Sequence, residues 1–352
     1  MKKHMTLSPV QMWLLVWAGL MAPVMDALPR LLLDGAGRNA WISVLLGGLL
    51  VLFLGCRLKT DSLPRLGESF LGKVFLTIYM VWLEGLLVLR LSSCAQRLLD
   101  SGARDGSGPF FLLVAVLLLL RLNSGSLSAF GRAGQLFFAA LALMAGAVLL
   151  LSLPTAKPER LLPVELPPLS PALLASGVLC WGLLPAAFLP VEREPIGKGF
   201  HWGLAGCILL TISQMIILAK LGPGLAAKVS APFFALAKGA GIEGAFQRVE
   251  SVVSALWLFS DLTMGGLLVF AQRRILSMVW GENKEQRTGG ILIVFAGLLG
   301  WILLPYIIYV DGKWVSMGNL MLAVLLVLIL LMGKYREKKN TGGISCGRET
   351  NQ

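Results

Sequence analysis

The sequence predicts an all-α polytopic membrane protein of ten transmembrane helices, arranged as two inverted repeats of five. The composition supports the membrane class, because 56% of the 352 residues are hydrophobic and only 14% are charged, which is too little polar surface for a soluble chain of this length. Ten apolar segments follow one another, and a bilayer core of about 30 Å takes roughly 20 helical residues. Prolines also interrupt the first and sixth segments at matching depths.

The ten predicted spans are separated by polar connections. In chain order they are Pro9–Leu33, Ala40–Leu58, Phe70–Leu98, Pro109–Leu122, Ala133–Leu153, Pro171–Pro190, Phe200–Leu221, Glu250–Leu276, Gly289–Tyr309 and Gly318–Met332. The fourth is short, which a tilted or partly shielded helix would accommodate. We expect one transmembrane domain over 1–333, with repeats at about 9–153 and 171–333, and a disordered polar tail over 334–352.

The distribution of Lys and Arg predicts the orientation. The net charge of +12 comes from basic residues scattered among short connections, which favours the positive-inside rule over nucleic-acid binding. More Lys and Arg residues fall on the cytoplasmic side when the N-terminus is placed inside, so both termini are expected in the cytoplasm. The N-terminal MKKHMTLSPVQMWLLVWAGLMA is similar to a signal peptide, but nine spans follow it and the topology needs it, so we expect it to be retained.

Two connections on the external side are longer than a turn. Pro154–Ser170 is proline-rich and is not expected to be helical throughout. Gly222–Arg248 contains a predicted short helix from about Ala231 to Lys238, capped by Ser230, and would form a compact external cover.

The first and sixth spans each carry glycine at mid-depth and proline soon after it. Pro23 follows Gly19, and Pro185 follows Gly182. Proline frees backbone groups, which are tolerated at this depth beside protein or a water-filled cavity, and matching breaks are typical of inverted-repeat transporters. The alternative is that these residues only kink the helices or permit close packing. The first interpretation predicts a ligand site lined by Gly19, Leu20, Met21, Ala22, Cys180, Trp181 and Gly182.

Three ionisable residues lie near mid-depth, namely Glu84 and Arg90 on the third span and Asp261 on the eighth. Glu84 and Arg90 are about 120° apart on a helix, so each needs a partner elsewhere, and Arg90 with Asp261 is one candidate pair. These groups are a site for ligand or ion coupling, with Glu84 as a neutral carboxylic acid, or a structural ion pair. Ser260 and Trp257, near Asp261, join the predicted ligand site.

Other polar residues carry weaker signals. Asp26 is expected near the outer end of the first span, where it can pair with Arg30 four residues later. The five cysteines and two histidines are isolated, so we expect no metal site and no cofactor. No nucleophile with a base and no phosphate-binding loop is present, so an enzyme is not expected.

Two motifs resemble those of the endospore germination permeases, the B subunits of nutrient germinant receptors within the amino acid/polyamine/organocation (APC) transporter superfamily. The first is LPRLLLDGAGRNAWISVLLGGLL (Leu28–Leu50), with Pro29, the turn at Asp34–Gly37 and Ala40–Trp41–Ile42. The second is APFFALAKGAGIEGAFQRVESVVSALWLF (Ala231–Phe259). Relatives often carry a glutamate in the broken part of span six and a lysine in span eight. This chain has no such glutamate and has Met264 near the expected lysine.

The resemblance implies a LeuT-like inverted-repeat fold in the inner spore membrane, in a complex with an A-type membrane subunit and a C-type lipoprotein. It implies that the chain binds a small nutrient, often an amino acid, between spans one, three, six and eight, and signals germination. A working H⁺- or Na⁺-coupled amino acid or amine symporter is the alternative, because the same fold serves both functions.

Overall fold

The computed structural model describes residues 6–58, 64–100, 107–192, 196–229, 231–239, 249–281, 285–309 and 312–345. These residues are helical apart from connections and one isolated β-bridge between Leu7 and Val191. The α-helices are α1 (Pro9–Ala36), α2 (Ala40–Arg57), α3 (Phe70–Asp100), α4 (Gly108–Asn123), α5 (Leu127–Ser152), α6 (Leu169–Ala186), α7 (Ile196–Leu221), α8 (Pro223–Lys228), α9 (Pro232–Lys238), α10 (Val249–Trp280), α11 (Glu285–Leu303) and α12 (Gly312–Ser345). Short 3₁₀ turns join them at Gly37–Asn39, Pro64–Glu68 (η4), Leu153–Thr155, Pro158–Leu161 and Leu304–Tyr309 (η8).

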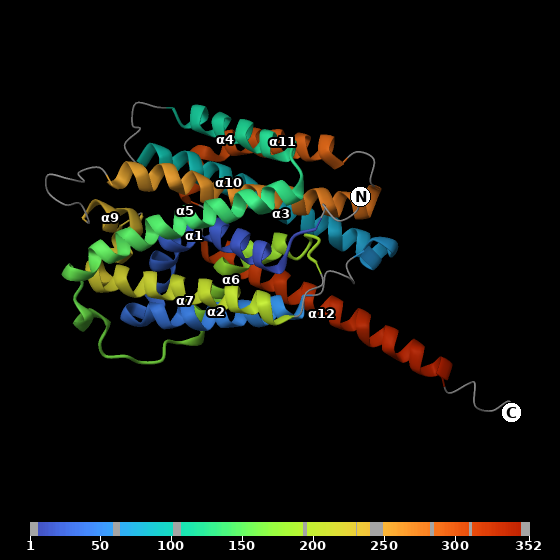
Figure 1. The fold of residues 1–352 in the computed structure, drawn as a ribbon, viewed down its shortest axis with the longest axis horizontal. Coiled ribbons are helices and arrows are strands. Elements are labelled where there is room, and N and C mark those ends of the chain that lie inside the picture. Colours follow the sequence, from blue (N-terminus) through green and yellow to red (C-terminus); the bar gives the residue numbers. More distant parts are fainter. Residues whose placement is uncertain are drawn as a thin grey trace.

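The long helices run side by side in one bundle (Figure 1). In the described chain, eight stretches are long and apolar enough to cross a membrane, judged by length and composition. They are Ala27–Arg57, Phe70–Leu99, Leu127–Thr155, Leu169–Ala186, Gly199–Leu221, Val252–Trp280, Gln286–Tyr306 and Gly312–Met332. Pro9–Met25 and Gly108–Asn123 are shorter apolar helices. The chain is therefore an all-helical polytopic membrane protein, while the ten-span inverted repeat stays a prediction.

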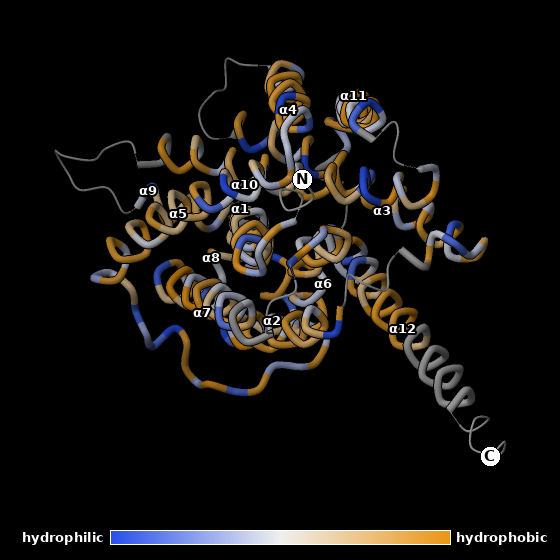
Figure 2. Tube along the Cα trace, turned by 45° about the vertical axis from the view of Figure 1, so that its right-hand side comes forward, coloured by the Kyte–Doolittle hydropathy of each residue, from blue (hydrophilic) through white to orange (hydrophobic). Residues whose placement is uncertain are grey.

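Helix α1 is at the centre of the bundle. Ser8 begins it with a capping box: its hydroxyl accepts from the Gln11 backbone N–H, and the Gln11 side chain accepts from Ser8 N–H. Such a box satisfies two otherwise free amides at a helix start. The helix packs against α10, α6, α5 and α7, and Figure 2 shows it between α10 and the α2, α6 and α7 group. An apolar helix buried on all sides is expected in such a position.

The predicted breaks in α1 and α6 are wrong. Helix α1 continues through Gly19 to Pro23 and contains Pro29 as well. Helix α6 continues to Ala186, with Pro185 in its last turn. Pro185 lacks the N–H that would donate to the carbonyl of Trp181, but the helix ends one residue later, at Ala186.

The structure bears on the predicted polar tail and on the predicted short helix before the eighth span. Helix α12 runs to Ser345, and the disordered tail over 334–352 stays a prediction. The Lys, Arg and Glu residues after Lys334 are good helix formers, and this stretch holds no proline. Helix α9 confirms the predicted short helix, with a further helix, α8, before it. Its cap residue is Ala231, which makes no side-chain cap bond; Ser230 lies outside the described residues, as does the side chain of Asp26.

Candidate functional site

Ser260 of α10 replaces the backbone hydrogen bond that Pro23 removes from α1. In a regular helix the amide of residue 23 donates to the carbonyl of residue 19, but proline has no amide hydrogen. The Ser260 hydroxyl donates to Gly19 O at 3.2 Å and accepts from Ala22 N–H at 3.1 Å. One hydroxyl can make both bonds, so the carbonyl that Pro23 leaves without its helical donor is still hydrogen-bonded.

The mid-depth glycines allow close helix packing. A Cβ built on Gly19 would lie 3.2 Å from the Met264 Cα and backbone nitrogen of α10, and one on Gly182 would lie 2.9 Å from Val16 Cγ1 of α1. Both distances are shorter than ordinary van der Waals contact. The alternative interpretation of these glycines therefore fits the structure.

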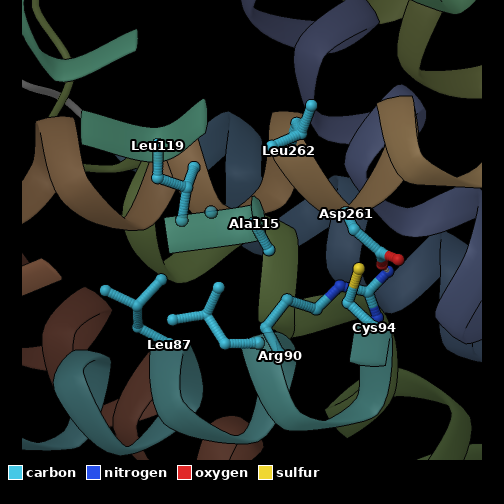
Figure 3. A pocket seen from close by; sticks show the side chains of 9 residues that line it. Leu87, Arg90, Cys94, Ala115, Leu119, Asp261 and Leu262 are labelled. Carbon is cyan, nitrogen blue, oxygen red and sulfur yellow. Dashed lines mark ion pairs between the residues drawn. The ribbon is translucent and has the colours of Figure 1, made fainter. Parts of the chain in front are cut away.

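The predicted ligand residues of α1 and α6 belong to the packed core. Leu20, Met21, Ala22 and Cys180 are at most 1% exposed, and none of them lines the pocket of Figure 3. Trp181 is half-buried. The structure brings these residues together around α1 as packing neighbours, and their role in ligand binding stays a prediction.

Asp261 forms ion pairs with two arginines of α3, Arg90 and Arg97. The exposed fractions of the three side chains are 4% for Arg90, 20% for Arg97 and 7% for Asp261. The predicted Arg90–Asp261 pair is present, and Arg97 is a second partner that the sequence interpretation did not include. Seven residues separate the two arginines, which is two helical turns, and this spacing could have placed them on one face. We call Arg90, Arg97 and Asp261 the charge cluster.

A small pocket adjoins the charge cluster between α3, α4 and α10. Figure 3 shows Arg90 reaching across it to Asp261, with the Cys94 thiol beside them. The pocket is lined by Leu87, Arg90, Leu91, Cys94, Ala115, Leu119, Asp261, Leu262 and Gly265. Its water-accessible volume is ≈ 10 Å³, about the least that one water molecule requires. Arg90 and Asp261 are among its lining residues, but the surface that the pocket exposes is apolar, and the pocket must widen before it can hold a ligand larger than water.

Glu84 and Gln272 form a second buried polar contact between α3 and α10. The Gln272 amide Nε2 donates to Glu84 Oε2 at 2.7 Å, and the two residues are 8% and 0% exposed. Among the described residues, Glu84 makes no ion pair, so the structural ion-pair alternative does not apply to it. The sequence interpretation missed Gln272, although it follows Asp261 by eleven residues, or about three turns, and so lies on the same face.

Further hydrogen bonds hold α6 against α3 and α12. Tyr79 of α3 donates its hydroxyl to Leu184 O at 3.1 Å, beside Pro185. Trp82 Nε1 donates to Asn319 Oδ1 at 2.9 Å, and Asn319 Nδ2 donates to Gly177 O at 3.2 Å. These contacts hold α6 at Gly177 and at Leu184, on either side of the predicted break at Gly182.

The predicted Trp257 lies above the charge cluster toward α9. It is 4% exposed, and its ring packs on Phe233 with centroids 5.3 Å apart. Among the described residues, the indole Nε1 has no hydrogen-bond partner. Trp257 thus joins α10 to the short helix α9 and does not line the pocket.

Comparison with known proteins gives limited similarity. No model of a protein family matches the sequence, and no curated protein matches it significantly. Among solved structures, the manganese transporter of Eremococcus coleocola, crystallised with an aromatic bis-isothiourea substituted compound, matches with a TM-score of 0.45 and 11% identity, over 94% of this chain and 95% of that one. In the described residues, no group of three or more His, Cys, Asp or Glu side chains is placed to hold a metal ion.

Proposed function

We propose that this chain is a B-type subunit of a nutrient germinant receptor, which binds a small amino acid and signals germination. The observation that carries the proposal is the charge cluster beside an aliphatic pocket. Buried charges in a membrane helix bundle are rare and mark functional sites or structural pairs. A cluster with two guanidinium groups and one carboxylate is complementary to a zwitterion.

The ligand would bind with its carboxylate at Arg90 and Arg97 and its ammonium group at Asp261. Guanidinium groups bind carboxylates through paired N–H donors, and a widened pocket would take an aliphatic side chain among Leu87, Leu119 and Leu262. The predicted contacts to Gly19–Ala22 and to Cys180–Gly182 are replaced in this proposal by indirect ones, because Ser260 directly precedes Asp261 and holds α1. A movement of Asp261 on ligand binding would therefore reach α1.

The two sequence motifs support the receptor role. The first covers the end of α1 and most of α2, and the second begins at α9 and ends in α10 at Phe259, the residue before Ser260. In this role the chain would lie in the inner spore membrane with both termini in the cytoplasm, partnered by an A-type subunit and a C-type lipoprotein. It would need no cofactor and would catalyse no reaction.

Spore germination tests this function. Spores that carry Asp261→Asn are expected to lose the response to the amino acid that triggers the wild type, measured as dipicolinate release, while Asp34→Asn is a matched control. Asp34 is exposed and pairs with Lys313 at 3.5 Å, so that variant should respond normally. Immunoblots must show equal protein levels, and a normal response by Asp261→Asn would refute the assignment. If Asp261→Asn fails to accumulate, Asp261→Glu, which keeps the charge, serves instead and should shift the response to higher ligand concentration.

A proton- or Na⁺-coupled symporter of amino acids or amines is the second candidate. The buried Glu84, which has no ion pair among the described residues, favours it, since coupled transport needs a group that changes charge within the membrane. Purified chain in proteoliposomes distinguishes the two functions. The receptor function predicts binding without accumulation, and gradient-driven accumulation by the isolated chain would replace it with the symporter.

A further inference from the structure

The contact between Glu84 and Gln272 lacks one hydrogen-bond donor. Gln272 Nε2 donates to Glu84 Oε2 at 2.7 Å. The other two oxygens, Glu84 Oε1 and Gln272 Oε1, are buried and have no hydrogen-bond partner among the described residues. Both are acceptors when the glutamate is ionised, and buried acceptors without a donor are costly in apolar surroundings.

A single proton on Glu84 would give both unpaired oxygens, Glu84 Oε1 and Gln272 Oε1, a hydrogen bond. A protonated carboxyl group has one O–H donor besides its acceptor oxygen. With the proton on Glu84 Oε1, this oxygen can donate to the Gln272 amide oxygen, while Gln272 Nε2 still donates to Glu84 Oε2. The carboxylic acid and the amide then complement each other at all four polar atoms. We infer that Glu84 and Gln272 form a binding site for one exchangeable proton between α3 and α10.

Neither of the two arginines nearest in sequence to the pair neutralises Glu84. Arg90, six residues along α3, is held by Asp261. Arg273, next to Gln272 on α10, donates to Asn123 O at 3.0 Å and lies over the Phe270 ring. Neither arginine is bound to Glu84, so a buried ionised glutamate would have only one hydrogen bond to offset its lost hydration.

Other titratable groups are exposed or already engaged. Tyr79 is bound to Leu184 O, and Arg97 is bound to Asp261. The remaining titratable side chains described on α3, on α10 and on the elements that pack against α3 are Cys94 beside Asp261, the half-buried Arg274, and the exposed Lys73, Arg121 of α4, Arg287 of α11, Glu68 of η4 and Tyr306 of η8.

The inference concerns the ligand-free protein and goes beyond the proposed function, because it holds for a receptor or a symporter alike. Infrared spectroscopy of the purified chain tests it directly. The C=O stretch of a protonated carboxyl group is separate from amide and carboxylate bands. At neutral pH the wild type should show such a band, Glu84→Gln should lack it, and the matched control Glu68→Gln should keep it. Gln272→Leu should keep the band at a higher frequency, because the acid then loses its amide partner.

Carbodiimide labelling is the second measurement. The apolar reagent dicyclohexylcarbodiimide reacts with protonated carboxyl groups in apolar sites, and mass spectrometry locates the adduct on the wild-type chain without any variant that could misfold. We expect labelling at Glu84 that falls as the pH rises, and none at Glu68. The absence of a Glu84-dependent band together with absent or pH-independent labelling would overturn the inference. Protection of Glu84 from the reagent by added Na⁺ at constant pH would also overturn the inference, by assigning the site to a metal cation.

Discussion

Ser260 Oγ lies 3.2 Å from the carbonyl oxygen of Gly19, the oxygen that Pro23 leaves without its helical donor. The same hydroxyl accepts from Ala22 N–H, so one side chain of α10 repairs α1 on both sides of the missing bond. The next residue, Asp261, is bound to α3. A two-residue segment of α10 thus ties the central helix to the charge cluster.

Removing this hydroxyl should destabilise the bundle. Ser260→Ala leaves a buried carbonyl and a buried amide without partners, and we expect a loss of about 1 to 3 kcal/mol in the free energy of unfolding. Unfolding by sodium dodecyl sulfate in mixed micelles measures it. Ser176→Ala is the control, because Ser176 is also fully buried but bonds only to Ala172 O of its own helix. Equal losses in the two variants would show that Ser260 has no special role.

The close approach of α1 and α10 predicts a steric effect at Gly19. Gly19→Ala puts a methyl group 3.2 Å from the Met264 backbone, where the neighbour is a main chain and cannot rotate away. Overpacking of this kind costs about 1 to 3 kcal/mol. In the control Gly146→Ala the new Cβ meets nothing within 4 Å, so the higher helix propensity of alanine should leave stability equal or slightly raised. A neutral Gly19→Ala would contradict the packing described for these helices.

The two arginines of the charge cluster should differ in importance. Arg90→Gln removes a guanidinium that is 4% exposed, and Arg97→Gln removes one that is 20% exposed. Breaking a buried pair costs about 3 to 5 kcal/mol, more than an exposed one. We expect a larger fall in melting temperature for Arg90→Gln, measured by fluorescence-detected size exclusion after heating. The reverse order would mean that Arg97 is the main partner of Asp261.

Among these core substitutions, Tyr79→Phe should cause the smallest loss of stability. Tyr79→Phe removes one hydrogen bond, that to Leu184 O, and keeps the ring between Phe75 and Phe188. One such bond contributes about 1 kcal/mol. Tyr306→Phe, at an exposed ring, is the control and should be neutral. No loss in Tyr79→Phe would mean that the end of α6 is held by the ring contacts alone.

The positions of the helices along the chain were largely predictable, because a long apolar segment within a membrane has few structures available other than a helix. The Arg90–Asp261 pair was predictable too, since each charge needs a partner and few exist. The continuity of α1 was not. Whether a proline opens a helix depends on what its neighbour supplies, and no local pattern in the sequence shows that Ser260 faces Gly19.

Gln272 and Arg97 were missed for the same physical reason. Gln272 and Arg97 are ordinary polar residues near the ends of long spans, and only the packing of α3 on α10 brings them to Glu84 and Asp261. Helical spacing on each helix would have grouped Arg90 with Arg97 and Asp261 with Gln272. Which face of one helix meets which face of the other is decided by the tertiary structure.

The central claim is that the charge cluster binds a small amino acid, and equilibrium binding on the purified chain tests it most directly. A panel of amino acids is screened by the rise in melting temperature that ligand binding to the folded state produces. We predict that at least one aliphatic amino acid stabilises the wild type and Asp34→Asn but not Asp261→Asn, and that its decarboxylated amine does not. If no amino acid stabilises the wild type, or if Asp261→Asn responds equally, the charge cluster is not the ligand site.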